Sequence, residues 1–158
     1  MTLQDTKTQK LVAWLWHWLP PLILMAMIFY VSSRSSLPQA KGEWVDALIK
    51  KISHIAEYTL LFLLLVRAWK RSLAGSWARW SLGIFGTGQS SNMEGALWAA
   101  LLTTAAYGIS DEVHQAFVPR RHANWYDVVI DVAVPLLLCL LWYGRRGLLR
   151  PRHPDLAE

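Results

Sequence analysis

The sequence predicts an all-α membrane protein, a bundle of about four transmembrane helices with short interfacial helices. Hydrophobic residues make up 54% of the 158 residues and charged residues only 17%, an apolar-rich balance compared with soluble proteins. Four apolar runs are separated by charged or Gly- and Ser-containing loops, and no alternating strand pattern is present. Several of the ten tryptophans flank these runs, as in the aromatic belts of membrane proteins.

The first apolar run covers residues 11–31, and its 21 residues are enough to cross a bilayer. Pro20 and Pro21 lie inside it, which membrane helices tolerate when neighbours satisfy the freed carbonyls. The loop over residues 32–51 begins with serines and Pro38, which favour turns. Within this loop we expect residues 43–51 to form a short amphipathic helix at the membrane surface.

The second predicted span covers residues 52–69, and its first two turns are polar. His54, Glu57 and Tyr58 follow one another at i, i+3 and i+4, so they share one face of the helix. The remainder of this span is almost wholly aliphatic.

The third and fourth spans enclose the most polar part of the chain. Residues 70–93 form a basic loop whose GTGQSSN segment is typical of a flexible linker. The third helix is predicted to begin at residue 94 and to continue past its apolar part, 94–109, through Gln115. After the connection 118–124, the fourth span covers residues 125–143 and contains Pro135. The chain is therefore one membrane domain with its core at 11–143 and a basic polar tail at 144–158.

The Lys and Arg count predicts the orientation of the bundle. With four spans, the N-terminal segment, the middle loop and the tail lie on one side and hold ten of the 16 basic residues, against six on the other side. The positive-inside rule therefore places both termini in the cytoplasm of a bacterial inner membrane. The net charge of +5 is explained by this topology, and we do not expect a nucleic-acid partner.

Polar residues distant in sequence are predicted to gather at one membrane depth, the outer ends of the helices. Residues 108–131 carry four of the eleven acidic residues between two apolar runs, and charge at the edge of a bilayer is costly unless it is used. The acid–base candidates are His54, Glu57, Asp111 and Asp127. The ligand-binding candidates are the other polar side chains at this depth: Arg34, Tyr58, Glu112, Gln115, Arg120, Arg121 and Asp131.

Each candidate pair has more than one chemical interpretation. A Glu57 carboxylate beside the His54 imidazole would orient the ring and raise its basicity, as a general base requires. The same pair would suit Zn²⁺ or Mn²⁺, but the HExxH spacing is missing, and we assign no metal and no cofactor. A satisfied hydrogen-bond network that only locks the helices together is a third interpretation.

The acidic pairs pose a similar choice. Of Asp111 and Glu112, we expect one to face inward and the other to face water, and Asp111 is the preferred inward residue. Asp127 and Asp131 lie one turn apart on one face, so one is expected to be protonated or to pair with a nearby arginine. Buried ion pairs that merely fix the bundle are the alternative.

The basic residues at this depth form a cationic rim. Arginine forks bind phosphate or carboxylate in a bidentate manner, and lipid headgroups present such groups at this depth. A solvated rim that only touches phospholipid is the simpler interpretation. The residues of the rim are Arg34, Lys50, Lys51, Arg120 and Arg121.

Three blocks of the chain resemble the VanZ-like membrane proteins. They are the Ser-rich loop ending in SSLP, the segment KISHIAEYTLLFLLL, and GISDEVHQAFVPRRHANWYDVVID. The third block is the most specific, since DE-x-x-Q, the Pro-x-Arg turn and the later Asp occur at the family's spacing. The chain departs from the family pattern at Arg120, where the family has Gly, and at Asp131, where it has Asn. Val134 and Pro135 also replace smaller residues.

The resemblance implies a protein of similar size with a handful of transmembrane helices. The founding member of that family is associated with resistance to the glycopeptide teicoplanin, so the resemblance implies a link to this phenotype. It implies no defined biochemical activity.

The sequence leaves three functional hypotheses. In the first, the protein binds or modifies an amphiphile at the outer leaflet, with the rim holding an anionic head and His54 with Asp111 or Glu57 acting on it. Phospholipids, lipid-linked wall precursors and lipoglycopeptides are the candidate ligands. In the second, the protein is a non-catalytic structural or partner-binding envelope protein whose polar cluster fixes helix packing. The third is a small proton-linked transporter, which is disfavoured because no acid lies in the central turns of the spans. Enzyme and binder remain open alternatives.

Overall fold

The protein is described by a computed structural model that covers residues 3–35, 43–74, 89–119, 121 and 123–149. These residues form four α-helices and no strand, which confirms the all-α class. The helices are α1 (Leu3–Ser32), α2 (Glu43–Ala74), α4 (Gln89–Gln115) and α5 (Trp125–Leu149). Within α1 and α5, the stretches Trp14–Ser32 and Trp125–Arg146 are long and apolar enough to cross a membrane. The total of four spans remains a prediction.

Several helix boundaries differ from the sequence-based expectation, among them the ends of α2 and α5, which extend to Ala74 and Leu149. The expected surface helix 43–51 and the span 52–69 are one continuous helix, α2, because no Gly or Pro interrupts the sequence between them. Helix α1 begins at Leu3 rather than after the polar N-terminal segment. Helix α4 begins at Gln89, so the QSSN part of the expected linker is helical. The predicted continuation of α4 through Gln115 is confirmed.

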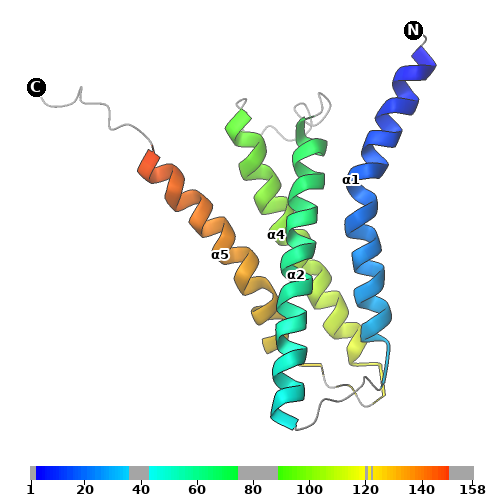
Figure 1. Ribbon diagram of the computed structural model, residues 1–158, viewed down its shortest axis with the longest axis vertical. Coiled ribbons are helices and arrows are strands. Elements are labelled where there is room, and N and C mark those ends of the chain that lie inside the picture. Colours follow the sequence, from blue (N-terminus) through cyan, green and yellow to red (C-terminus); the bar gives the residue numbers. More distant parts are fainter. Residues whose placement is uncertain (1–2, 36–42, 75–88, 120, 122, 150–158) are drawn as a thin grey trace, which may run out of the picture.

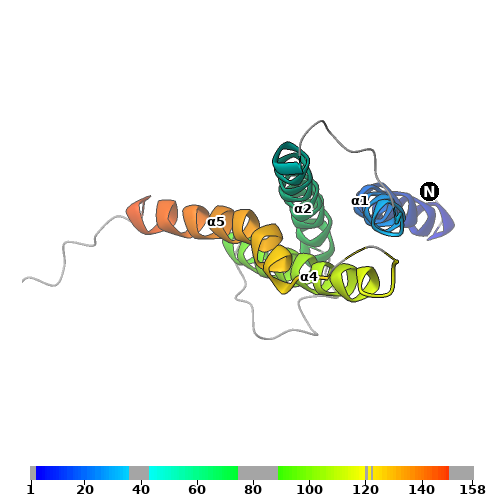
Figure 2. The same ribbon diagram turned by 90° about the horizontal axis from the view of Figure 1, so that it is seen from below.

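The four helices run alternately up and down (Figure 1). Helices α2 and α4 form an inner pair, with α1 and α5 on opposite sides of it (Figure 2). Over the described residues α1 and α5 make no contact with each other. The helices converge at the end where α1 and α4 finish and α2 and α5 begin, and they diverge towards the other end. We call these the site end and the basic end.

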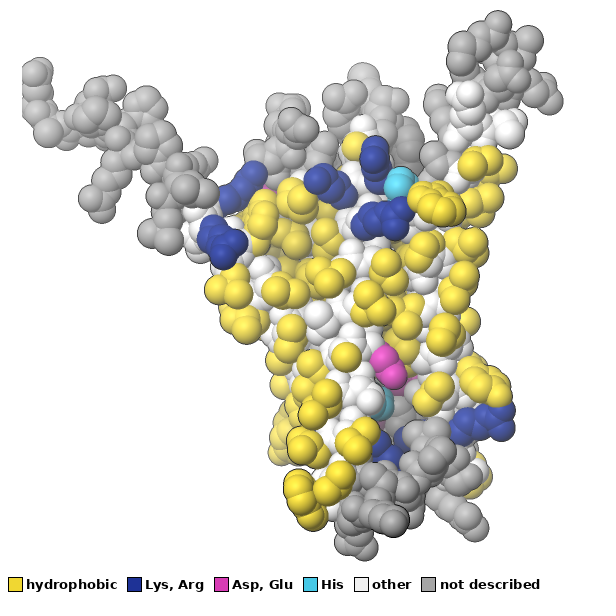
Figure 3. Space-filling model, viewed as in Figure 1, with side chains coloured by type: hydrophobic (Ala, Val, Ile, Leu, Met, Phe, Trp, Pro, Cys, Tyr) yellow, Lys and Arg dark blue, Asp and Glu magenta, His cyan; other side chains and the backbone are white. Residues whose placement is uncertain are grey.

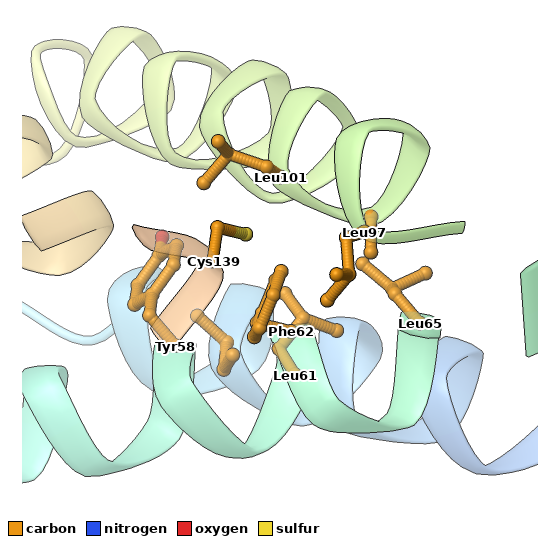
Figure 4. Close-up of a cluster of buried hydrophobic side chains, with 9 residues drawn as sticks. Tyr58, Leu61, Phe62, Leu65, Leu97, Leu101 and Cys139 are labelled. Atoms are coloured by element: carbon orange, nitrogen blue, oxygen red, sulfur yellow. The ribbon is translucent and has the colours of Figure 1, made fainter. Parts of the chain in front are cut away.

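The core lies between α2 and α4 and is closed by single residues from the outer helices. Figure 4 shows Tyr58, Leu61, Phe62 and Leu65 of α2 facing Leu97 and Leu101 of α4, with Cys139 of α5 beside them. The α2 positions are spaced by three or four residues, so they form one apolar stripe. Ala96 and Ala100 are fully buried in α4, where their small side chains allow the two helices to approach closely.

The outer surface of the bundle is strongly apolar. Many large hydrophobic side chains on α1 and α5 are exposed, among them Trp16, Met27, Val129 and Leu140. Figure 3 shows this apolar surface extending over much of one face, with Lys and Arg side chains towards both ends. A soluble monomer rarely exposes so much contiguous apolar area, so this surface fits a lipid environment.

Candidate functional site

The site end gathers polar residues from all four helices. The last turn of α1, the first turns of α2, the last turns of α4 and the first turns of α5 meet there (Figure 1). The predicted site residues that the structure describes lie in these turns or in the loops next to them, except Glu57 and Tyr58, which lie near the middle of α2. The roles assigned to these residues remain predictions.

Asp111 is the centre of a buried hydrogen-bond network. Its side chain is 2% exposed, and its Oδ2 accepts hydrogen bonds from Ser32 Oγ at 2.9 Å, Tyr58 Oη at 3.3 Å and Gln115 Nε2 at 2.8 Å. The donors come from α1, α2 and α4. We call Asp111, Ser32, Tyr58 and Gln115 the Asp111 network. It joins three helices through one carboxylate oxygen, while Oδ1 is buried without a hydrogen-bond partner among the described residues.

Gly108 lies where α4 packs against Tyr58. A Cβ atom at this position would lie 3.4 Å from Tyr58 Cε1 and 3.8 Å from Val128 Cγ1, which is ordinary van der Waals contact. Alanine would therefore fit here against the ring that supplies one of the three donors to Asp111. Gly108, the first residue of the block GISDEVHQAFVPRRHANWYDVVID, is thus part of the helix contact beside the Asp111 network.

His54 is paired with Asp131 of α5. The His54 Nδ1 atom lies 3.6 Å from Asp131 Oδ2, with Asp131 buried and 29% of the His54 side chain exposed. The ring of His54 also lies nearly parallel to that of Tyr58, with centroids 6.2 Å apart. The structure places Asp131 rather than Glu57 against the His54 imidazole. His54 and Glu57 share one face of α2, but α5 packs on α2 and brings Asp131 to the Nδ1 atom.

Glu57 remains close to this pair without bonding to it. The side chain is half-buried and makes no hydrogen bond or ion pair with any residue in the described part of the chain. It is near enough to His54, Asp111 and Asp131 to interact electrostatically with each of them. Glu57 is thus a second carboxylate beside the His54–Asp131 pair.

Glu112 and Asp127 serve as links between elements. Glu112 is buried, so the expectation that one of the two adjacent acids faces water is wrong. Its Oε2 accepts a 2.7 Å hydrogen bond from the backbone N–H of Asn124, which draws the connection after α4 back over the helix end. Burial raises the pKa of Glu112, which lies beyond the apolar residues 94–109, and the Asn124 bond opposes that rise. Asp127 forms an ion pair with Lys51 at 2.9 Å.

Arg121 is a structural anchor. Its Nε donates to the backbone oxygen of Arg34 at 3.1 Å and its Nη2 donates to that of Val31 at 3.3 Å. The expected pairing of an arginine with Asp127 or Asp131 is not formed by Arg121 or Arg34, since Lys51 and His54 take those positions. The cation satisfies carbonyls that the end of α1 leaves without helical partners.

Arg34 is a rim cation whose guanidinium is exposed to solvent. Its guanidinium lies 4.5 Å from the ring centroid of Tyr30 and is exposed. No ion pair joins it to a described acidic residue. Arg120 of the predicted rim lies outside the described residues.

Two contacts of the site end were not anticipated from the sequence. Ser32 donates to Asp111, and His114 stacks on Phe29 with its Nε2 3.0 Å from Ser33 Oγ. The position of both serines at the end of the first apolar run is the signal that would have identified them. Over the described residues, no three His, Cys, Asp or Glu side chains are grouped so that they could hold a metal ion.

The arrangement offers two kinds of chemistry. A histidine whose Nδ1 faces a buried carboxylate has its other nitrogen free to accept a proton or a hydrogen bond. The exposed guanidinium of Arg34 suits a phosphate or carboxylate. The Asp111 network connects the two, because Ser32 lies two residues before Arg34 and Tyr58 stacks on His54.

One comparison with known proteins gave a match. A family model described as VanZ/LLP1 covers residues 4–146, nearly the whole chain. Neither the curated proteins nor the solved structures gave a match. The two apolar helices and the family match together point to a membrane protein.

Proposed function

The chain belongs to the VanZ/LLP1 family, and on that premise we propose that it binds an amphiphile with an anionic head at the outer leaflet of a bacterial inner membrane. The ligand is a phospholipid, a lipid-linked wall precursor or a lipoglycopeptide. In this proposal the protein crosses the membrane several times with both termini in the cytoplasm, so that the site end faces outward.

The observation that carries the proposal is the availability of Arg34 at the end that also holds the His54–Asp131 pair. Arg34 makes no ion pair with the described acids, and α1 beside it exposes Phe29, Tyr30 and Val31. When the phosphate or carboxylate of a headgroup binds the guanidinium, the lipid tail of the same molecule can lie along this apolar side of α1. An amphiphile therefore matches both the positive charge of Arg34 and the apolar surface beside it.

His54 is the residue that would contact a polar group of the bound head. Asp131 holds the Nδ1 side of the ring, so the exposed side of the imidazole faces outward to accept or deliver a proton. Glu57 lies next to it as a second acceptor. Such a pair can orient a ligand or act on it, and both outcomes require that the head reach His54.

We link this site to teicoplanin. Teicoplanin is chosen because the founding member of the family is associated with resistance to it. The lipid tail of teicoplanin gives a physical reason for selectivity over other glycopeptides. A tail anchored in the outer leaflet holds the headgroup at the depth of the site and raises its effective concentration there. A glycopeptide without a tail, such as vancomycin, gains nothing comparable.

Expression in a susceptible Gram-positive host tests the function. We expect the minimal inhibitory concentration of teicoplanin to change by more than that of vancomycin. His54→Ala or Asp131→Asn should abolish this difference, while Glu94→Gln, a neutralised acid at the opposite end, should retain it. Unchanged susceptibility at confirmed membrane expression would overturn the link to resistance. Retained activity in both site variants would instead reject the site.

A structural role is the second candidate, and the Asp111 network favours it. One buried carboxylate oxygen holds donors from three helices, which is what a group that fixes helix packing does. Native mass spectrometry with a lipid-tailed anionic probe separates the two candidates. Retention of the probe by the wild type and its loss in Arg34→Gln supports binding, and equal retention of anionic and zwitterionic probes supports the structural role.

A further inference from the structure

A second cationic cluster lies at the basic end, opposite the site end. Arg67, Lys70 and Arg71 are spaced i, i+3 and i+4 on α2, so they share one face, and all three are exposed. His17 of the neighbouring α1 is close enough to Arg67 and Arg71 to interact with them electrostatically. Figure 3 shows Lys and Arg side chains gathered at this end beside a histidine and hydrophobic side chains.

Within the described part of the chain, these cations form no ion pair, unlike the other arginine at this end that is described next. Arg146, at the same end, pairs with Glu94 at 2.6 Å and lies over Trp142. No described acidic side chain forms an ion pair with Arg67, Lys70 or Arg71. The Nδ1 atom of His17 is buried and has no hydrogen-bond partner in the described part of the chain. Like charges this close repel one another, and an anion between them removes the repulsion.

A tryptophan cluster adjoins these cations. The ring of Trp14 stacks on Trp18 with centroids 6.1 Å apart, and Trp18 meets Trp69 edge-on at 5.2 Å. The indole N–H of Trp18 donates to Ser72 and that of Trp69 donates to Thr103, which fixes both rings. Trp14 is half-exposed. An indole ring has a polar N–H group and an apolar ring face, so it is suited to the glycerol and ester region of a bilayer.

We propose that the basic end of the α1–α2 face binds the headgroup of an anionic phospholipid. The phosphodiester would lie against Arg67 and Arg71, and the glycerol backbone would pack on Trp14 and Trp18. The tail would follow the exposed apolar side of α1. This site takes lipid from the leaflet opposite to that of the amphiphile site, and it does not depend on the proposed function.

Native mass spectrometry of the detergent-solubilised full chain tests the proposal. Phosphatidylglycerol is titrated against the wild type, with phosphatidylcholine as the zwitterionic comparison. We expect phosphatidylglycerol to bind at least about tenfold more tightly, since each basic group near an anionic headgroup contributes several-fold in affinity. The double variant R67Q/R71Q should lose this preference.

A matched variant separates a site from general electrostatics. R145Q/R146Q also removes two positive charges from the basic end, but from α5, which makes no contact with α1 over the described residues. We expect it to retain affinity within about threefold of the wild type. Equal losses in the two double variants, or no preference for phosphatidylglycerol in the wild type, would overturn the proposal. Displacement of the lipid by millimolar glycerol 3-phosphate would also overturn it, because the site would then recognise a free phosphate.

Discussion

Asp111 accepts hydrogen bonds from three buried donors. In an Asp111→Ala variant, the Ser32 hydroxyl, the Tyr58 hydroxyl and the Gln115 amide lose their shared acceptor. Hydrogen bonds to a charged group are worth about 1.5–3 kcal/mol each but are not additive, so we expect the free energy of unfolding to fall by about 3–5 kcal/mol. Denaturant titration in detergent, followed by circular dichroism, measures this loss.

The neighbouring Ser110→Ala variant is the control for this measurement. Ser110 is exposed, and among the described residues its Oγ donates to the Tyr107 backbone of the same helix alone. Its removal should change the free energy of unfolding by less than about 0.5 kcal/mol. An equal effect of the two substitutions would show that the Asp111 network does not hold the bundle together.

His54 and Asp131 are expected to act as one unit in ligand recognition. If Asp131 works only through His54, then His54→Gln and Asp131→Asn each lower the affinity for teicoplanin by about tenfold, and the double variant loses no more than either single variant. Binding to the protein in lipid nanodiscs measures all four affinities. Independent losses, which would multiply to about a hundredfold in the double variant, would contradict the pairing.

The sequence identified most residues of the site end but not their partners. Helical spacing placed His54, Glu57 and Tyr58 on one face, and the density of charge identified Asp111 and Asp131. The pairing of His54 with Asp131 depends on how α5 crosses α2, and spacing within one helix carries no information on that crossing. Ser32 was missed because a serine after an apolar run is typical of a turn, which hid its role as a donor to Asp111.

At the scale of the helices, the connection between α4 and α5 is held by Arg121. Its two bonds to the Arg34 and Val31 carbonyls tie this connection to the end of α1. We expect Arg121→Ala to lower the free energy of unfolding by about 1–2 kcal/mol, since both bonds are exposed and carry one charge. Arg121→Lys should restore less than half of this loss, because an ammonium cannot reproduce the planar fork.

Hydrogen exchange locates the effect of Arg121 in the fold. In Arg121→Ala, the amides of residues 116–124 should exchange faster, while those in the middle of α2 should keep their rates. Uniform acceleration throughout the bundle would contradict a local anchor and would indicate global destabilisation.

The helix boundaries show which sequence signals were informative. The strictly apolar part of the third span is short, which predicts that the helix extends through its charged end to Gln115, and the structure confirms this. The expected division of α2 at residue 52 is wrong, because a change from polar to apolar composition does not end a helix. Composition sets the environment of a helix, whereas Gly, Pro and capping residues are the signals for its ends.

For the whole molecule, the proposed orientation can be tested by cysteine accessibility. In a Cys139→Ala background, Ser35→Cys and Ala123→Cys at the site end should react with a membrane-impermeant maleimide added to intact cells. Ala74→Cys, at the basic end, should react only after permeabilisation. The three positions are exposed in the structure. Labelling of Ala123→Cys only from the cytoplasm would reverse the orientation.

Over the described residues, α1 and α5 are not in contact, which bears on how the two outer helices contribute to stability. Packing contacts connect them there only through α2 and α4. Substitutions on their outward sides, such as Leu22→Ala in α1 and Leu137→Ala in α5, should therefore contribute additively to stability. Substitutions can then adapt α1 or α5 to lipids of a different length or saturation without requiring changes in the other helix.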